Sequence, residues 1–356
     1  MRVVPAAATL GVLLAASATL PLDAHKPITS PYTFAEDVSP ILRDRCGACH
    51  VAGGPAPMPL TTAEETVPWG ESIRLELIAG HMPPWSAMSG GKRLRHAEGL
   101  TARELNVLLT WVTGGAPPGD AKPLPTASAA ATDWPLGPPD LMLPLPEVAV
   151  AADQGELTRE IVLPLDAAAR RPLRAVDLRP GTRSLVRSAR IAVRRPSGGT
   201  SDVETLVGLW VPGDQPATLP PGTAFAVPSD AELVITLRLK KTWEHEREAM
   251  SDRSTLALYF AGTAEPVRRL ALTGQPFREG LRVLSIYPSP ASAGATVTLD
   301  ATSPEGTVQR LIEFEPHSGW DRRYAFDPPF DLPAGTRLQA SGSDAIVLNV
   351  VSSPTR

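Results

Sequence analysis

Two cysteines and a histidine near the N-terminal end are the residues of this chain best placed for chemistry. The 356-residue sequence has only two cysteines, and they form the run Cys46-Gly47-Ala48-Cys49-His50. A disulfide within this run would close a very short loop and stabilise the fold little. Cys-x-x-Cys-His is instead the attachment signature of c-type haem, because both thiols can reach the vinyl groups of one porphyrin edge while the imidazole reaches the iron. We predict one covalent haem c, with thioether bonds to Cys46 and Cys49 and with His50 as the proximal iron ligand.

Two other uses of a cysteine pair fit the sequence less well. A zinc ribbon needs a second pair of ligands at suitable spacing, and the sequence has no second Cys-x-x-Cys. A thioredoxin-like dithiol needs a βαβ context, which the sequence around the pair does not suggest.

The opposite side of the iron needs a second ligand or an open position. Met82 lies in the run His81-Met82-Pro83-Pro84-Trp85, where two prolines predict a stiff, extended loop. A thioether ligand raises the reduction potential of haem and suits electron transfer. We predict Met82 as the distal axial ligand. The competing candidates are Met58, Met88, His81 and His96.

Helices are expected to position these residues. Thr33 and Glu36 form a helix-starting pattern, and Thr101 and Glu104 form a second one before an apolar stripe that ends at Gly114-Gly115. A third helix is expected over residues 69–79. We expect Trp85 and Trp111 to wall the haem, and Arg74 and Lys92 are candidates for binding its propionates.

Residues 33–120 resemble a bacterial family of single-haem cytochrome c domains. The resemblance is carried by the Cys46–His50 motif and by the segments Phe34–Leu42, Pro57-Met58, Met82–Trp85 and Leu100–Pro117. It implies a small all-α cytochrome c domain, placed at residues 30–120, in which the methionine of Met-Pro-Pro-Trp is the distal ligand.

The N-terminal end and the composition indicate an exported protein. Residues 1–24 have a positive start, an apolar run and an Ala-x-Ala cleavage pattern, as in a secretory signal peptide; an uncleaved anchor is the alternative. No later segment approaches 18 apolar residues. We therefore expect a periplasmic or otherwise exported protein, without a membrane span after signal cleavage. The formal net charge of −4 gives no sign of nucleic-acid binding.

The rest of the chain is expected to be β-rich. The sequence has 39 prolines, which disfavour long helices and suit turns and edge strands. After a linker at residues 121–135, apolar runs of strand length alternate with turn residues, which is typical of an antiparallel sandwich. We predict an α + β multidomain protein with jelly-roll-like β-sandwich domains at residues 136–272 and 273–356. The runs Leu219–Thr223 and Leu332–Thr336 form a short internal repeat.

This β-rich region resembles the copper-dependent, ascorbate-using monooxygenases of the peptidylglycine hydroxylase type. The resemblance is carried by short runs: Trp134–Asp140, Arg179–Gly181, Gly208–Gly213, Asp252–Ser254, Tyr259–Ala261 and Trp320 to Thr336. It implies two copper ions held by five histidines and one methionine. The positions of those ligands hold Arg187-Ser188, Arg238-Leu239-Lys240 and Ser289-Pro290-Ala291, and no methionine follows Met250.

The histidine count argues independently against copper. After the haem segment only His245 and His317 remain, and their contexts predict a charged surface loop and a turn. We therefore expect no copper, and a β-region that serves docking or structure. The sequence as a whole predicts an exported electron carrier that exchanges single electrons with a redox protein partner, rather than an enzyme. The alternatives are an active copper monooxygenase fed by the haem and a haem-based gas sensor.

Overall fold

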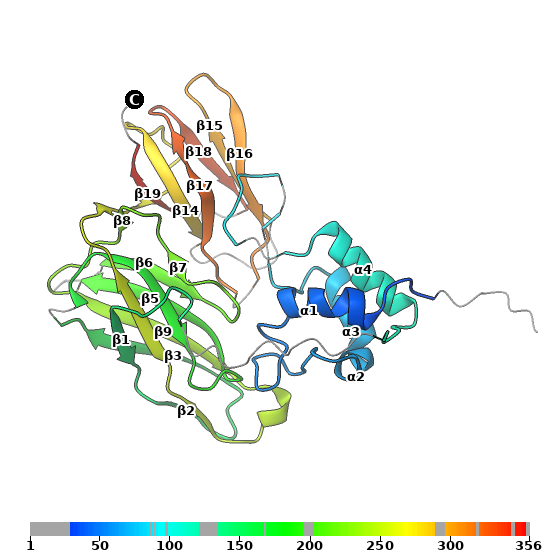
Figure 1. Ribbon diagram of the computed structural model, residues 1–356. Coiled ribbons are helices and arrows are strands. Elements are labelled where there is room, and N and C mark those ends of the chain that lie inside the picture. The colour runs from blue at the N-terminus through cyan, green and yellow to red at the C-terminus, as the bar shows by residue number, and fades with distance from the viewer. Residues whose placement is uncertain are drawn as a thin grey trace, which may run out of the picture.

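The computed structural model describes residues 29–85, 87–88, 90–96, 99–120, 134–166, 169–195, 203–288, 296–317, 320–342 and 346–353. Strands contain 39% of the residues and helices 15%, so the chain is mostly β with a small helical part (Figure 1). The expected signal peptide and residues 121–133 of the expected linker lie outside the described residues.

Apart from one short turn of helix at Trp243–His245, the described helices lie between residues 34 and 113. They are η1 (Phe34–Val38), α1 (Ser39–Arg45), α2 (Ala63–Thr66), η2 (Val67–Trp69), α3 (Gly70–Ile78) and α4 (Ala102–Thr113). The Thr101 side chain accepts a hydrogen bond from the Glu104 backbone N–H, and the Glu104 carboxylate accepts one from the Thr101 N–H, as the sequence predicts. At the start of η1, Asp37 takes the place expected for Glu36 and accepts from the Thr33 N–H. A widened π-turn explains the change, because it moves the partner along by one residue.

One apolar cluster joins these helices. Trp111 on α4 is fully buried and lies 5.9 Å from the Phe34 ring. Val38, Leu42 and Leu108 complete its centre, and Cys46 and Met58 pack at its margin. The chain closes around the cluster through a hydrogen bond from the Ser30 N–H to the Gly114 carbonyl. The expected apolar stripe of α4, Leu105, Leu108, Leu109 and Val112, packs against this cluster, but the most deeply buried residues of the helix are Val107, Leu108 and Trp111.

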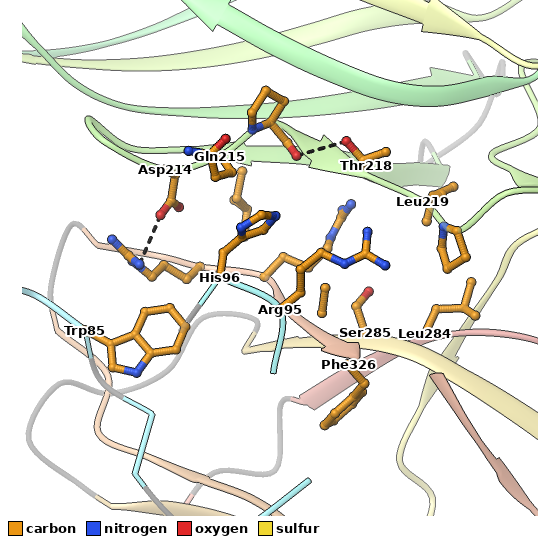
Figure 2. A pocket seen from close by; sticks show the side chains of 16 residues that line it. Trp85, Arg95, His96, Asp214, Gln215, Thr218, Leu219, Leu284, Ser285 and Phe326 are labelled. Atoms are coloured by element: carbon orange, nitrogen blue, oxygen red, sulfur yellow. Dashed lines mark hydrogen bonds and ion pairs between the residues drawn. The ribbon is translucent and has the colours of Figure 1, made fainter. Parts of the chain in front are cut away.

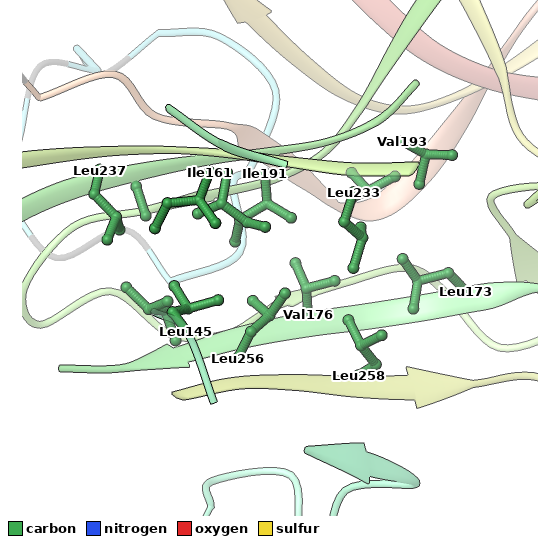
Figure 3. Packing of buried hydrophobic residues seen from close by; sticks show 14 of the residues in the cluster. Leu145, Ile161, Leu173, Val176, Ile191, Val193, Leu233, Leu237, Leu256 and Leu258 are labelled. Atoms are coloured by element: carbon green, nitrogen blue, oxygen red, sulfur yellow. The ribbon is translucent and has the colours of Figure 1, made fainter. Parts of the chain in front are cut away.

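The first β-region consists of two antiparallel four-stranded sheets with one core between them. In spatial order, the strands are β1 (Leu141–Pro144), β11 (Thr255–Phe260), β4 (Leu173–Arg179) and β7 (Ala217–Thr218) in one sheet, and β3 (Glu156–Pro164), β9 (Glu232–Lys240), β5 (Val186–Arg195) and β6 (Val203–Trp210) in the other. Figure 3 shows side chains of the two layers facing each other, such as Ile191 and Leu233 opposite Val176 and Leu258. We call this unit the first sandwich.

The second sandwich has the same construction with fewer strands. Its sheets have the orders β13 (Arg268–Ala271), β19 (Ile346–Ser352), β14 (Leu281–Pro288), β17 (Tyr324–Leu332) and β16 (Val308–Phe314), β15 (Val297–Thr302), β18 (Arg337–Ser341). Its core is a separate apolar cluster. The predicted antiparallel β architecture is thus confirmed. Strand β13 pairs with β19, so the second sandwich recruits residues that precede the expected boundary at 273.

Short elements complete the fold. The strands β2 (Val148–Val150) and β10 (Met250–Asp252) pair antiparallel, and β8 (Thr223–Ala224) and β12 (Glu265–Pro266) pair parallel. The single-turn helix η4 spans Trp243–His245. The internal repeat corresponds to one turn used twice: Gly222 and Gly335 both have positive φ, and the strands that follow pair differently.

The segment that follows Met82 leaves the helices and lies on the second sandwich (Figure 1). Ala87 forms an isolated antiparallel bridge with Phe314 of β16, and Leu94 forms one with Phe326 of β17. Backbone hydrogen bonds reinforce both, including one from the Arg95 N–H to the Ala325 carbonyl. We call the described residues of this segment, 85, 87–88 and 90–96, the strap. It extends both sheets of the second sandwich at their adjacent edges.

Candidate haem site

The Cys-x-x-Cys-His motif forms a tight turn at the end of α1. The backbone N–H groups of Cys46 and Gly47 both donate to the Leu42 carbonyl, at 2.8 and 2.7 Å. Those of Cys49 and His50 both donate to the Cys46 carbonyl, at 3.0 and 2.9 Å. A Cβ at Gly47 would lie 2.5 Å from the backbone oxygen of Arg43, which explains why glycine occupies this position. The backbone of the motif is therefore shaped by hydrogen bonds within the motif and to the end of α1.

The His50 ring is held in the state that metal binding requires. Its Nδ1 lies 3.0 Å from the Met58 backbone oxygen. A carbonyl only accepts hydrogen bonds, so Nδ1 carries the proton and Nε2 keeps a free lone pair. Burial lowers the pKa of His50, against a smaller opposing effect of the Met58 hydrogen bond. The imidazole is therefore neutral at pH 7, with Nε2 available to a metal.

Both cysteines are free and stay protonated. Burial raises the pKa of Cys46 to about 12 and that of Cys49 to about 11. For Cys49, burial outweighs the lowering by Arg322 and Arg187, the next largest influences. Thiols with such pKa values are poor nucleophiles at neutral pH, which disfavours a role as a reactive redox dithiol.

Met82 lines a cleft of about 640 Å³ next to the helices. Its side chain is 38% exposed. The Trp85 N–H donates to the Pro83 carbonyl at 2.7 Å, so the loop after Met82 turns back sharply where the sequence predicted an extended path. The lining residues include Leu77, Met82, Trp85, Met88, Lys92, Leu100 and Leu105.

The cleft lies next to the apolar cluster in which Cys46 packs, because two residues belong to both. Leu77 and Leu105 line the cleft and also belong to the cluster in which Cys46 packs. In the described part of the chain, Cys46, Cys49 and His50 are not themselves among the lining residues. Cys46 thus packs in this apolar cluster, whereas Met82 lines the neighbouring cleft and is not among the described members of the cluster.

The competing ligands occupy distinct places. Met58 lies behind His50, because its carbonyl binds the ring nitrogen that faces away from the metal position. His81 is turned outward, with its Nδ1 3.1 Å from Glu76 Oε2, and His96 lines a different cavity. Met88 lines the same cleft as Met82 and is the other residue placed to act as the distal iron ligand.

Of the residues expected to wall the haem or to bind its propionates, two line the cleft and two do not. Trp85 and Lys92 line the cleft, and the Lys92 ammonium lies 5.0 Å from the Phe330 ring centre. Trp111 instead fills the helical core and donates to the Pro117 carbonyl at 3.0 Å. Arg74 pairs with Glu71 on the exposed face of α3.

The first sandwich touches the motif, a contact that sequence reasoning missed. The Cys49 thiol donates to the Pro212 carbonyl at 3.6 Å, and a Cβ at Gly213 would lie 2.6 Å from the Ala48 Cβ. Next to this contact, Asp214 and Arg322 form an ion pair at 3.0 Å that is largely buried. The Pro212-Gly213 pair predicted a turn, but nothing in the sequence indicated what the turn packs against.

Two of the three runs that replace the expected copper ligands, at 187–188 and 238–240, lie on neighbouring strands of the first sandwich. Ser188 on β5 is the strand partner of Arg238 on β9. Arg238 Nε lies 2.5 Å from Glu156 Oε1, and Arg187 donates to the Ser184 carbonyl. His245 pairs with Glu248 on the surface, and residues 289–291 lie outside the described residues. Within the described ranges, no group of three or more His, Cys, Asp or Glu side chains is arranged to hold a metal ion.

No protein-family model matches the chain, and no curated protein is significantly similar to it. Among the described helices, none has the length and apolar character needed to cross a membrane.

Proposed function

We propose that this protein is an exported c-type cytochrome that carries one covalent haem and transfers single electrons to or from a redox protein partner. The observation that carries the proposal is the state of His50. Its Nδ1 donates a hydrogen bond to the Met58 carbonyl, and its Nε2 has no hydrogen-bond partner among the described residues. A metal-binding histidine typically donates its other ring N–H to a backbone carbonyl in this way.

The residues present fit a haem. Cys46 and Cys49 would form the thioether bonds, His50 would bind the iron from one side, and Met82 would bind it from the other. Haem supplies a one-electron iron couple at this place. The chain contributes a buried, apolar surround through Leu77 and Leu105, and this surround limits the access of water.

The β-region serves to hold and cover this site in our proposal. The first sandwich contacts the motif at Pro212 and Gly213, and the second sandwich binds the strap. Arginines stand at the positions where the monooxygenase-like resemblance would require histidines, and their cationic groups are poor copper ligands at neutral pH. We therefore propose a degenerate monooxygenase-like region without copper catalysis.

The test is production of the full chain with haem maturation factors, followed by haem staining on a denaturing gel and metal analysis. We expect covalent haem, iron close to one per chain, and localisation outside the cytoplasm. The Cys46→Ser/Cys49→Ser double variant should lose the stain. A wild-type protein without covalent haem would overturn the proposal, and two coppers per chain would support the monooxygenase instead.

A further inference from the structure

A second cavity lies at the junction of three parts of the molecule. It is enclosed by the strap, by the loop after β6 in the first sandwich, and by β14, β17 and the residues before β17 in the second (Figure 2). Its volume is about 70 Å³. One water needs about 10–15 Å³ of such space, so the cavity has room for about five waters or one small organic molecule.

The charged groups around this cavity are unbalanced. Three arginines line it, Arg95, Arg322 and Arg323, against the single carboxylate of Asp214, which leaves a formal excess of 3 − 1 = +2. Asp214 pairs with Arg322, whose side chain is only 6% exposed. Arg95 forms no ion pair or side-chain hydrogen bond with any residue that the structure describes, and Figure 2 shows it reaching into the cavity.

Arg322 is buried and Arg323 is partly buried, and each has one side-chain nitrogen without a partner among the described residues. Arg323 donates to the Leu206 and Val207 carbonyls, both at 2.9 Å, and burial lowers its pKa to about 10. The Nε atoms of Arg322 and Arg323 have no partner among the described residues, but both atoms are themselves buried. What these two arginines add to the cavity is therefore positive charge in a partly enclosed place, where it acts more strongly than in water.

We propose that this cavity binds a small organic carboxylate. The carboxylate would meet the guanidinium of Arg95, whose planar fork of donors suits anions with two oxygens. The rest of the ligand would lie against the apolar side of the lining, formed by Leu209, Leu219, Leu284 and Phe326. The mixture of a cationic end and an apolar wall favours an organic acid over a simple inorganic anion.

The proposed site is next to the candidate haem site, because Asp214 and Arg322 lie beside the contact between Cys49 and Pro212. The two cavities share only Trp85 among their described lining residues, and none of Cys46, Cys49, His50 and Met82 lines the carboxylate cavity. Because no proposed haem-binding residue lines the carboxylate cavity, either proposal can fail alone.

The experiment is calorimetric titration of the purified full chain with propionate, with propionamide as its uncharged analogue and with inorganic phosphate. We expect saturable binding of propionate, no detectable binding of propionamide, and weaker binding of phosphate. Equal affinity for propionate and propionamide, or the absence of saturable propionate binding, would overturn the proposal. Tighter binding of phosphate would overturn the assignment to carboxylates.

Two variants and one control locate the site. Arg95→Gln should weaken propionate binding at least tenfold, because it removes a charge-assisted hydrogen bond. Gln215→Trp places bulk at an exposed lining position and should also weaken it. Arg93→Gln is the matched control, since Arg93 lies on the same strap, pairs with Asp327 and does not line this cavity. A loss of affinity in Arg93→Gln equal to that in Arg95→Gln would place the binding elsewhere.

Discussion

The two sides of the proposed haem site are held by different parts of the molecule. On the motif side, Cys46, Cys49 and His50 are fixed by hydrogen bonds within residues 42–60. On the methionine side, Met82 opens a segment that is fixed by strand-like pairing with Phe314 and Phe326, more than 200 residues away along the chain. If the proposed haem is bound, its attachment should depend mainly on local structure, whereas the placement of Met82 should depend on the β-region.

The comparison extends to burial. The thiol of Cys49 is covered by the first sandwich, but Met82 remains 38% exposed in an open cleft. Met82 and His50, the two proposed iron ligands, are therefore held differently, and mutations near one should leave the other in place. The four changes below act on one side at a time.

The largest effect is expected from Met82→Ala. It should leave the haem covalently attached but abolish the methionine–iron absorption band, because the motif side is unchanged and the distal ligand is gone. The visible spectrum of the oxidised protein measures this, and faster binding of carbon monoxide to the reduced protein should accompany it.

Met88→Ala is the matched control, since Met88 lines the same cleft and is 43% exposed. It should keep the band. A band that survives in Met82→Ala and disappears in Met88→Ala would transfer the ligand role to Met88. Rapid carbon monoxide binding to the wild-type protein would instead favour a gas sensor.

Trp85→Ala should disturb the methionine side without affecting attachment. The Trp85 ring packs edge-on against Tyr324 at 5.8 Å, and Arg322 lies 5.1 Å from its centre. Loss of these contacts should lower the free energy of unfolding by roughly 3 kcal/mol and weaken the methionine–iron band. Denaturant unfolding followed by circular dichroism measures the first effect.

Trp243→Ala provides the control for Trp85→Ala. Trp243 is 62% exposed, so its removal should change the free energy of unfolding by less than about 0.5 kcal/mol. If both variants were equally stable, the strap would not depend on Trp85.

The same division explains what the sequence could and could not predict. The motif and the capped α4 were predictable because their signals are local: a fixed spacing for the thiols, and Thr101 with Glu104 for the helix start. The short helix α2 was missed although Thr62 and Glu65 carry the same capping pattern, because four residues give no apolar periodicity.

The long-range contacts were out of reach for a different reason. Pairing of Leu94 with Phe326 leaves no periodic signature in either segment, and the approach of Gly213 to Ala48 depends on how two separate units dock. Arg322 and Arg323 are neighbours in sequence, but their meeting with Arg95 is set by the strap. Residues brought together by tertiary packing carry no mark of it in one sequence.

Glu104→Ala should destabilise the motif side moderately and in a pH-dependent way. Glu104 caps α4 and also accepts from Arg45, the last residue of α1, at 3.1 Å. We expect a loss of about 1–2 kcal/mol at pH 7. Burial alone would raise the pKa of Glu104, but the hydrogen bonds from Thr101 and Arg45 outweigh it, so its pKa lies below the ordinary value.

The sign of the pH effect follows from that lowered pKa. Stability from Glu104 is present above the pKa of the unfolded chain, about 4.3, and is lost as the pH falls through the lower folded value. The difference between wild type and Glu104→Ala should therefore shrink in acid, as urea unfolding at several pH values would show. Glu71→Ala, which removes an exposed pair with Arg74, should cost little at any pH. A pH-independent difference for Glu104→Ala would contradict the ionic role of Glu104.

The smallest effect is expected from Gly213→Ala, which tests the contact between the first sandwich and the motif. Gly213 has φ of 86°, so any Cβ costs about 1 kcal/mol there, and this Cβ would also lie 2.6 Å from that of Ala48. Gly306→Ala separates the two costs, because Gly306 has φ of 88° with nothing within 4 Å of its added Cβ. Gly213→Ala should therefore be the more destabilising of the two in thermal unfolding. Combining Gly213→Ala with Ala48→Gly should remove the extra destabilisation, because the crowded Cβ of Ala48 is gone. Equal destabilisation by Gly213→Ala and Gly306→Ala would show that the first sandwich does not pack tightly against the motif.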